Sequence, residues 1–445
     1  MIIVWDWVLL LLALPLLFFP DHLLGVILGL ILIQLAIRKA VTGEFIPSTP
    51  YNLAILILLL SLGMSFLVTF NLSLSLPKIS SILIGIALFF SITIYSKQKD
   101  VWSVVWVYLA LGFLMALVGL FGSVWQPPFT FLNEWKKLWP LEAGIPGTAE
   151  GIINANELAG VLCWIAPLML ACVLGLRRRL WNKYAVIYIL LTAATLVTIF
   201  LLIATSSRGG ILAFSVSAVL VSFFFVSGRW RLVLAIGSVI VVLILISYGR
   251  SLTDQDIVGD TLGFSGRIEI WSRALLALSD HPVTGVSVNG FRQVVHVLYP
   301  LFGISSEIDI AHAHNHLLQA GLDFGLFGLA SYLAIWIVSA ALLFATIRNL
   351  VRRRARSHPY YALAAGLSGS LMAGWLFGIF DAVALGSRPA FMWWILISLT
   401  ASLHYAVVYS GKHLRVHRRV AQDTPLEGNG QLLSPAAGLG THQEL

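Results

Sequence analysis

Long apolar runs recur along most of the chain and are separated by short polar segments. A helix needs about 20 predominantly apolar residues to cross a hydrocarbon layer about 30 Å thick. Twelve runs reach or approach this length, and they lie near residues 6–20, 23–37, 52–70, 79–95, 101–121, 152–175, 184–204, 209–227, 231–248, 317–347, 360–380 and 390–410. The first two are short and suit a hairpin that only dips into the membrane. The pattern predicts an all-α polytopic membrane protein, with about 12 transmembrane helices in one domain over residues 1–410.

The composition supports the same class. Of the 445 residues, 59% are hydrophobic and only 11% are charged, and the mean hydropathy is +0.91. Such values exclude a set of ordinary soluble domains. Residues 411–445 differ, because they are poor in aromatic and branched side chains. They are predicted to form a disordered cytoplasmic tail.

The basic residues predict the orientation of the chain. Most of the 28 lysines and arginines fall in alternate connections, among them RRR at 177–179 and RNLVRRRAR at 348–356. Because cytoplasmic loops of membrane proteins are rich in such residues, both termini are expected in the cytoplasm. The net charge of +8 is therefore mainly an orientation signal. With no accompanying motif, it does not indicate a nucleic-acid partner.

Two of the outward-facing segments are long, at residues 122–151 and about 249–316. The aromatic and proline-rich stretch WQPPFTFLNEWKKLWP in the first suits an interfacial belt better than a substrate contact. In the second, a large periplasmic loop, SGRIEIWSRALLALSDHP predicts a short helix that Pro282 closes. Its expected features are a cap at Ser265, an apolar stripe of Ile268, Trp271, Leu275 and Leu278, and a Glu269–Arg273 ion pair.

Two arginines on the outer face stand in unusual positions. Arg267 occupies the first turn of the predicted helix, where a cation opposes the helix dipole unless an anion shares the site. The alternative is an ordinary solvated arginine. Arg208 lies in TSSRGG, a connection of a few residues between two apolar runs, on the side where basic residues are disfavoured. We expect Arg208 to hold a lipid-linked anion near the membrane surface.

Several acidic and amide residues enter the membrane at its outer edge. Asn154, Asn156 and Glu157 open the sixth run, while Asp323 and Asp381 lie at the outer ends of the tenth and eleventh. Buried polar groups need partners. These residues could pair with an arginine or line a polar cavity, and the sequence leaves both alternatives open.

Three histidines, His312, His314 and His316, crowd the entrance to the tenth run. On a strand they would share one face, which is a known zinc-ligand arrangement, whereas on a helix His312 and His316 would share a face without His314. The leucine and glycine pattern that follows favours the helix, so no metal site is predicted. DQD at 254–256 is similarly interpreted as a solvated turn.

A neutral histidine near a helix N-terminus can accept a proton from a hydroxyl. Beside two arginines suited to a diphosphate, it would suit transfer of a group from a phosphate to an alcohol.

A set of short motifs carries a family resemblance. His314 and Asn315 are followed, after nine residues, by Gly325 and then Gly328. NANELAG at 154–160, SSRGG at 206–210, GRIEIW at 266–271 and HPVTGVSVNGF at 281–291 precede them in order. Together, over about residues 150–380, these motifs resemble those of the bacterial O-antigen ligase and polymerase superfamily of membrane glycosyltransferases.

The resemblance implies a helical fold similar to that of other lipid-linked-sugar glycosyltransferases (GT-C-like), in the bacterial inner membrane with a periplasm-facing site. It implies an undecaprenyl-diphosphate-linked glycan as donor and an inverting reaction that needs neither metal nor cofactor. Arg208 and Arg267 would bind the diphosphate, and His314 would act as the base. Candidate supporting residues are Asn156, Glu157, Arg273, Asn315, His316 and Arg388.

The resemblance leaves the acceptor open among the lipid A core, a growing glycan and protein hydroxyls. Ligases commonly place two hydroxyl residues after the last glycine, and here Leu329 and Ala330 stand there. A glycan-repeat polymerase and a protein O-oligosaccharyltransferase are therefore alternatives within the same chemistry. A solute transporter is the alternative of another class. Transporters often contain paired halves, and no internal repeat is evident in this sequence.

Overall fold

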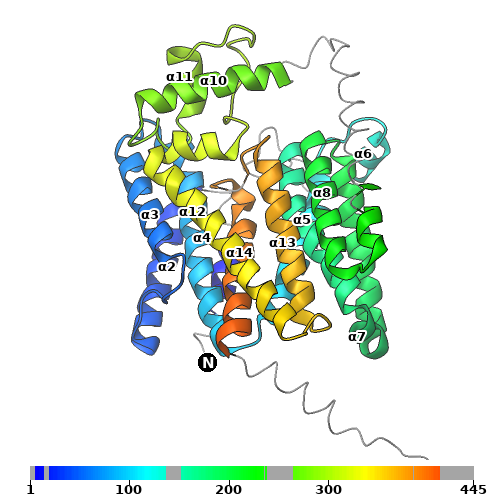
Figure 1. The fold of residues 1–445 in the computed structure, drawn as a ribbon. Coiled ribbons are helices and arrows are strands. Elements are labelled where there is room, and N and C mark those ends of the chain that lie inside the picture. The colour runs from blue at the N-terminus through cyan, green and yellow to red at the C-terminus, as the bar shows by residue number, and fades with distance from the viewer. Residues whose placement is uncertain are drawn as a thin grey trace, which may run out of the picture. The chain divides into compact units, whose positions relative to one another are not determined.

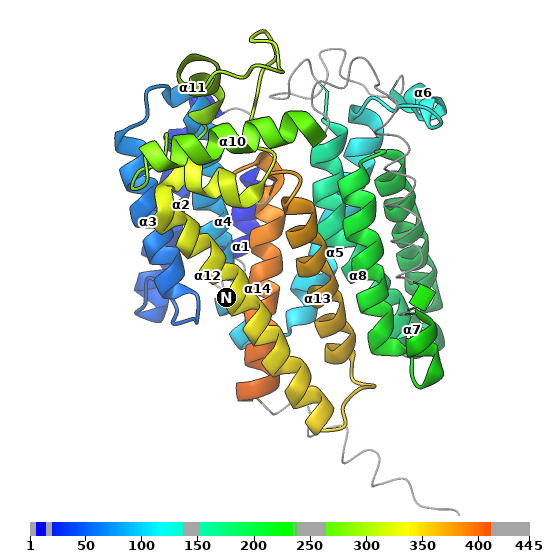
Figure 2. The ribbon, with the colours of Figure 1, turned by 45° about the horizontal axis from the view of Figure 1, so that its top comes forward.

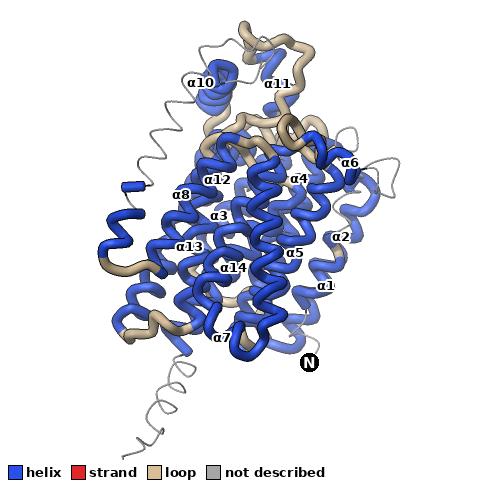
Figure 3. The backbone as a smooth tube through the Cα atoms, turned by 90° about the vertical axis from the view of Figure 1, so that its right-hand side faces the viewer, coloured by secondary structure: helices blue, strands red, loops and turns tan. Residues whose placement is uncertain are grey.

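The computed structural model describes residues 6–14, 20–136, 152–234, 236–237, 264–383 and 385–410. In these parts of the chain the structure consists of helices and connecting loops, without a strand (Figure 3). An isolated bridge joins Ser123 to Ile153. The predicted tail at 411–445, the DQD segment at 254–256 and most of the run at 231–248 lie outside the described residues.

The described elements follow one another along the chain as helices and short helical turns. They are α1 (Asp6–Leu12), α2 (Pro20–Thr42), α3 (Asn52–Leu67), α4 (Leu72–Gln98), α5 (Val101–Gly122), η3 (Thr130–Leu132), α6 (Asn133–Lys136), α7 (Ala155–Ala204), α8 (Arg208–Phe225), α10 (Phe264–Asp280), α11 (Phe291–Leu298), α12 (His316–Arg352), α13 (Pro359–Gly378), η5 (Arg388–Ala390), α14 (Phe391–Tyr405) and η6 (Ala406–Ser410). The predicted all-α class is confirmed for this part of the chain.

Seven of the described helical segments are long and apolar enough to cross a membrane, so the chain is a multi-pass membrane protein. One of them, α7, covers two predicted runs, because the backbone at Tyr184 is not helical (φ −143°, ψ 55°) and divides the 50-residue segment. Among the described residues of the first predicted run, α1 has 7 residues, fewer than a crossing helix needs. The predicted total of twelve crossings stays a prediction.

Three helices, α4, α13 and α14, are the most buried spans of the bundle. α14 packs on α4, α7 packs on α13, and α3 packs on α12 (Figure 1). Glycine permits some of these contacts, because a Cβ on Gly85 of α4 would lie 2.0 Å from the Trp394 ring of α14. Small residues at helix interfaces are the usual means of close approach in membranes. Cys163 and Cys172 are free and buried in α7.

A break in α12 creates the surface on which the site is built. Gly325 has φ 67° and ψ −172°, and it divides α12 into a short first segment and a long spanning segment. The first segment lies across one end of the bundle, beneath α10 (Figure 2). Only glycine fits here, because a Cβ would also lie 2.1 Å from the Val283 carbonyl oxygen.

The helix predicted in the large loop is confirmed as α10, but its buried face differs from the predicted stripe. The structure buries Ile270, Ala274 and Ala277 in a common core with α11, and it also buries Leu278 of the predicted stripe, whereas Ile268 and Leu275 are 51% and 56% exposed. The two alanines allow close packing, which the bulkier stripe would prevent. Ser265 lies within the first turn, because α10 begins at Phe264.

The prediction of an ion pair between Glu269 and Arg273 is also wrong, because both side chains have other partners. The Glu269 carboxylate accepts hydrogen bonds from the backbone N–H groups of Phe302 and Gly303. Arg273 donates from Nε to the Pro300 carbonyl oxygen at 2.8 Å, and its guanidinium lies over the Phe302 ring. Both side chains therefore fasten the 300–303 loop to α10.

Candidate active site

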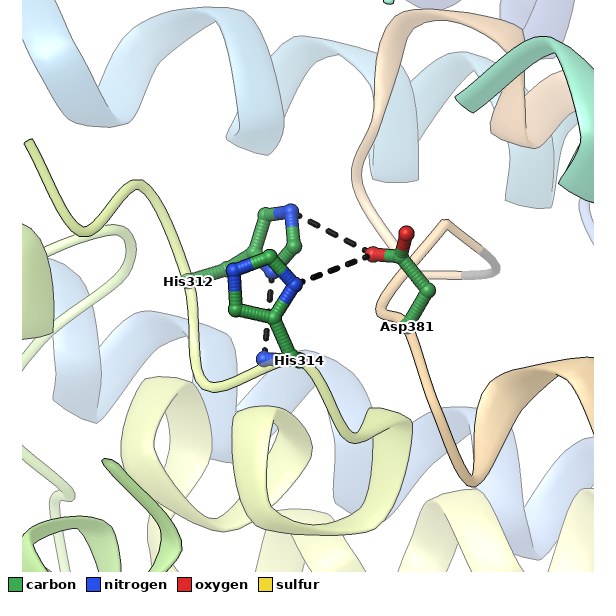
Figure 4. A group of neighbouring side chains, drawn as sticks. All are labelled: His312, His314 and Asp381. Atoms are coloured by element: carbon green, nitrogen blue, oxygen red, sulfur yellow. Dashed lines mark hydrogen bonds and ion pairs between the residues drawn. The ribbon is translucent and has the colours of Figure 1, made fainter. Parts of the chain in front are cut away.

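Two loops bring His312, His314 and Asp381 together at the end of the bundle (Figure 4). His312 Nε2 lies 3.3 Å from Asp381 Oδ1, and His314 Nδ1 lies 3.9 Å from the same oxygen. The two imidazole rings are in edge contact, with centroids 4.3 Å apart. Asp381, which follows α13, is buried, while both histidines keep part of their side chains accessible. The group is therefore suited to exchange protons with a molecule bound at this surface.

The preferred helical interpretation of the three histidines is wrong at residues 312–315. α12 begins only at His316, because the Asn315 side chain caps it by accepting hydrogen bonds from the N–H groups of Leu317 and Leu318. His314, two residues before the helix, has a left-handed backbone conformation with φ 48°. This turn directs His314 to His312 and Asp381 instead of continuing the helix.

Asn315 also connects the two loops of the site. Its Nδ2 donates a hydrogen bond of 3.1 Å to the carbonyl oxygen of Ile379, two residues before Asp381. The same side chain thus fixes the start of α12 and the loop that carries the carboxylate. This explains physically why an amide follows His314.

We expect Asn315→Ala to lower the stability of the purified protein by about 1 kcal/mol, because the cap is lost. Asn315→Ser should recover most of that stability, since a serine hydroxyl also caps a helix, but not the connection to Ile379. Activity should therefore stay reduced in both variants. Thermal unfolding in detergent and initial transfer rates measure the two effects separately. Full activity of Asn315→Ser would show that the Ile379 connection is dispensable.

The hydrogen bonds of His312 define its tautomer. The backbone N–H of His314 donates to His312 Nδ1 at 3.2 Å, so this nitrogen is an acceptor. Burial lowers the pKa of His312 to about 4, aided by the charges of Lys78 and Arg267. The neutral ring therefore carries its proton on Nε2 and directs it to Asp381.

A metal ion is the alternative occupant of this group. His312, His314 and Asp381 offer ligand atoms that all lie within 4.8 Å of one another. However, a protonated Nε2 on His312 cannot bind a cation, and the nearby charge of Arg267 would repel one. The donor set therefore fits proton transfer better than metal coordination.

His314 is the less constrained of the two histidines. Its Nδ1 faces Asp381 but is buried without a hydrogen bond among the described residues. Burial lowers the pKa of His314, and the neighbouring His312 acts in the same direction. Burial raises the pKa of Asp381, although His314 and Arg267 oppose this. A neutral imidazole beside a carboxylate is the arrangement of a general base whose protonated form is stabilised.

Arg267 is a cation that influences the titration of both His314 and Asp381. It lies in the first turn of α10 and is close enough to act electrostatically on both His314 and Asp381. Its Nε is buried and has no hydrogen-bond partner among the described residues. A guanidinium with a buried, unpartnered Nε beside a helix N-terminus suits an anionic ligand, so the structure favours this alternative over a solvated surface arginine.

Glu157 and Arg388 extend the polar group on the side of α7. Glu157, in the first turn of α7, interacts electrostatically with Asp381 and Arg388. Asn156 precedes it, and Asn154 caps α7 by accepting from the N–H groups of Asn156 and Glu157. Of the residues that the sequence placed at the outer membrane edge, Glu157 and Asp381 therefore lie close together. Asn156 and Glu157 are partly buried, whereas Asn154 is exposed.

Arg208 begins α8 at the same group of loops. Ser207 caps this helix by accepting from the Gly210 N–H, and the Arg208 side chain is exposed. Gly209 lies against Phe380, the residue before Asp381: a Cβ on Gly209 would lie 3.4 Å from that of Phe380. The chain thus places Arg208 next to the Asp381 loop, at a helix N-terminus suited to anions.

Two other candidate residues have structural partners. Arg273 fastens the 300–303 loop, as described above. His316 is 2% exposed and shares a hydrogen bond of 2.9 Å with the Tyr332 hydroxyl. Its ring packs against those of Trp336 and Trp375. These contacts indicate packing roles.

Two residues of this region carried weak sequence signals. The sequence leaves the role of Asp381 open, because its approach to His314 depends on a contact between segments distant in sequence. Lys78 has a local signal, because it is a lone charge near the start of a long apolar helix; in the structure it forms an ion pair with Asp323. Lone charges at such positions are a usable signal.

Residues 193–333 match a protein-family model described as O-antigen ligase. The resemblance to the O-antigen ligase superfamily is thereby confirmed over these residues. The matched residues include Arg208, Arg267 and His314, whereas Glu157, Asp381 and Arg388 lie outside them. A search of curated proteins finds no match to the chain. The family and the membrane helices support a membrane protein that processes glycans.

Proposed function

We propose that this protein transfers a glycan from an undecaprenyl-diphosphate carrier to an acceptor hydroxyl. The observation that carries the proposal is the pairing of His314 with Asp381 near Arg267, whose Nε is buried without a hydrogen-bond partner among the described residues. These groups supply a base, a carboxylate that stabilises the protonated base, and a cation for a leaving anion. The O-antigen ligase match makes a glycan the favoured group to be transferred.

In the proposed reaction, His314 accepts the proton of the acceptor hydroxyl while its oxygen attacks the anomeric carbon of the donor. The bond from that carbon to the phosphate oxygen breaks, and the diphosphate leaves with the electron pair. Arg267 and Arg208 stabilise the charge that develops on it, in the way that preorganised cations do. Because one displacement occurs at one carbon, the anomeric configuration inverts. Arginine charge takes the place of a metal in this scheme.

The distribution of charge supports a periplasm-facing site in the bacterial inner membrane, with both termini in the cytoplasm. The basic stretches at 177–179 and 348–356 belong to connections that the orientation rule assigns to the cytoplasm. The loops of the site belong to the opposite set of connections. A lipid diphosphate is a suitable donor there, because nucleotide-activated sugars are cytoplasmic.

The acceptor divides the proposal into related activities. Lipid A core as acceptor defines a ligase, a growing glycan defines a repeat polymerase, and a protein hydroxyl defines an O-oligosaccharyltransferase. A transporter would instead move the lipid-linked glycan without breaking its bond to phosphate. The cluster of titratable groups on one face favours transfer over transport.

A reconstituted assay tests the proposal. Purified protein in proteoliposomes is incubated with undecaprenyl-diphosphate glycan and, in separate reactions, with lipid A core, a glycan acceptor or a serine-containing peptide. Mass spectrometry should find the glycan on one acceptor, with equal yield when a chelator is present. Intact donor that only changes leaflet would support the transporter, and activity restored by zinc or manganese after chelation would refute the metal-free scheme.

The pH dependence of the reaction follows from the pKa of the base. His314 works only in its neutral form, so activity is retained above its pKa and lost as pH falls through it. Because burial lowers this pKa below the ordinary value of about 6.5, the acidic midpoint of kcat should lie below pH 6.5. A rate profile between pH 4 and 8 measures it. A midpoint at or above pH 6.5 would argue against a buried neutral base.

A further inference from the structure

A buried ion pair lies beside the candidate active site and was not among its predicted residues. Lys78 of α4 forms an ion pair with Asp323 in the first segment of α12. The exposed fractions of the two side chains are 11% and 1%. Lys78 also acts electrostatically on His312. An ion pair so deeply buried is maintained only when its remaining hydrogen-bonding capacity is also satisfied.

The second carboxylate oxygen of Asp323, Oδ1, has hydrogen-bond partners of its own. Oδ1 accepts one hydrogen bond from the Gln319 side-chain amide and one from the backbone N–H of Asn289, both 2.9 Å long. Gln319 lies one turn earlier on α12, and Asn289 lies in the loop before α11. Asp323 therefore connects α4, α12 and the 285–290 loop.

Gln319 extends the connection to the histidines. Its Oε1 accepts a hydrogen bond of 2.8 Å from the backbone N–H of Ala313, the residue between His312 and His314. Ala313 is fully buried, and His314 has a left-handed backbone. A turn of this kind needs such support, because a non-glycine residue at positive φ is unfavourable on its own.

The same connection also fixes the neighbouring loop. Asn289, itself at φ 60°, donates from Nδ2 to the Leu74 carbonyl oxygen at 3.0 Å. Ser75 donates to the Val288 carbonyl oxygen at 2.7 Å. The start of α4 is thus the fixed support for both the 285–290 loop and, through Asp323 and Gln319, the histidine turn.

We propose that Gln319 and Asp323 are positioning residues that hold the turn at 312–314 in the conformation that directs His314 to Asp381. The proposal rests on the proposed function for its effect on catalysis, but the positioning itself is a property of the unliganded protein. Neither residue touches the reacting groups in this scheme. Their effect passes through the Ala313 backbone.

The first test measures the turn without substrate. Full-length purified protein is treated with diethyl pyrocarbonate, and the rate of modification of His314 is followed by peptide mass spectrometry. In Gln319→Met, which removes both hydrogen bonds at similar volume, His314 should react at least threefold faster. Ser331→Ala is the matched control: Ser331 is also on α12, but its hydroxyl donates to Ala54 of α3. Its His314 rate should match the wild type.

The second test measures catalysis. Gln319→Met should lower kcat for glycan transfer by at least tenfold and change KM for the lipid-linked donor less than twofold, because the arginines are untouched. Gln319→Glu places two carboxylates together and should be similarly impaired.

The outcomes separate the two proposals. An unchanged His314 modification rate in folded Gln319→Met protein would overturn the positioning role, whatever the activity. A changed modification rate in a protein that transfers no glycan would leave positioning supported and refute the proposed function.

Discussion

Replacement of His314 with alanine is expected to lower the rate of glycan transfer by about two to four orders of magnitude, the usual contribution of a general base. No other described residue presents an imidazole both beside Asp381 and partly accessible, except His312, whose Nδ1 is already bonded to the His314 backbone. Binding of the lipid-linked donor should change little. Single-turnover transfer rates and donor binding to the same preparation measure the two quantities.

His281→Ala is the matched control for this prediction. His281 is exposed, and it lies between α10 and α11, within the same extramembrane segment. The control should transfer glycan at the wild-type rate. If His314→Ala protein that is folded and binds donor also transfers at the wild-type rate, His314 is not the base.

Replacement of Arg267 with alanine is expected to reduce kcat/KM for the donor by about 10²- to 10³-fold, the effect of removing a preorganised charge from a developing anion. The proposed diphosphate contact is supported by the Arg267 Nε, which is buried without a partner among the described residues. Arg267→Lys should recover only part of the loss, because an ammonium cannot make paired hydrogen bonds to phosphate oxygens. Steady-state rates at varied donor concentration measure the effect.

Arg292→Ala is the control for Arg267. Arg292 lies on α11 and is bound to the exposed carboxylate of Asp309. Its loss should change kcat/KM less than threefold, since surface ion pairs contribute little. Equal losses in Arg267→Ala and Arg292→Ala would point to a general effect of charge on this segment, against a specific diphosphate contact.

The spanning helices could be predicted from the sequence because each is an apolar run of about the length that the hydrocarbon layer requires or longer. α10 could be predicted because apolar residues recur at helical spacing in one stretch of an otherwise polar loop. Its buried face could not, since Ile270, Ala274 and Ala277 are chosen by the shape of α11 and α12. The break at Gly325 was visible only as a glycine, and its consequence depends on contact with Val283.

The candidate site, too, could be predicted only in part from the sequence. His314 was predicted from motif spacing, and Arg267 from its unfavourable place in a helix dipole. The preferred helical conformation of residues 312–316 was wrong, because the Asn315 cap delays the helix to His316. Asp381 and Lys78 reach the site through packing of distant helices, and no local pattern encodes that approach.

The most direct measurement of the central claim is the stoichiometry and stereochemistry of a single reaction. Purified wild-type protein is given undecaprenyl-diphosphate glycan of known anomeric configuration and its acceptor, and products are followed by mass spectrometry and NMR. The proposed mechanism predicts one undecaprenyl diphosphate released for each glycosidic bond formed, with inverted configuration at the anomeric carbon. Release of undecaprenyl monophosphate, retention of configuration, or loss of donor without a new glycosidic bond would contradict it.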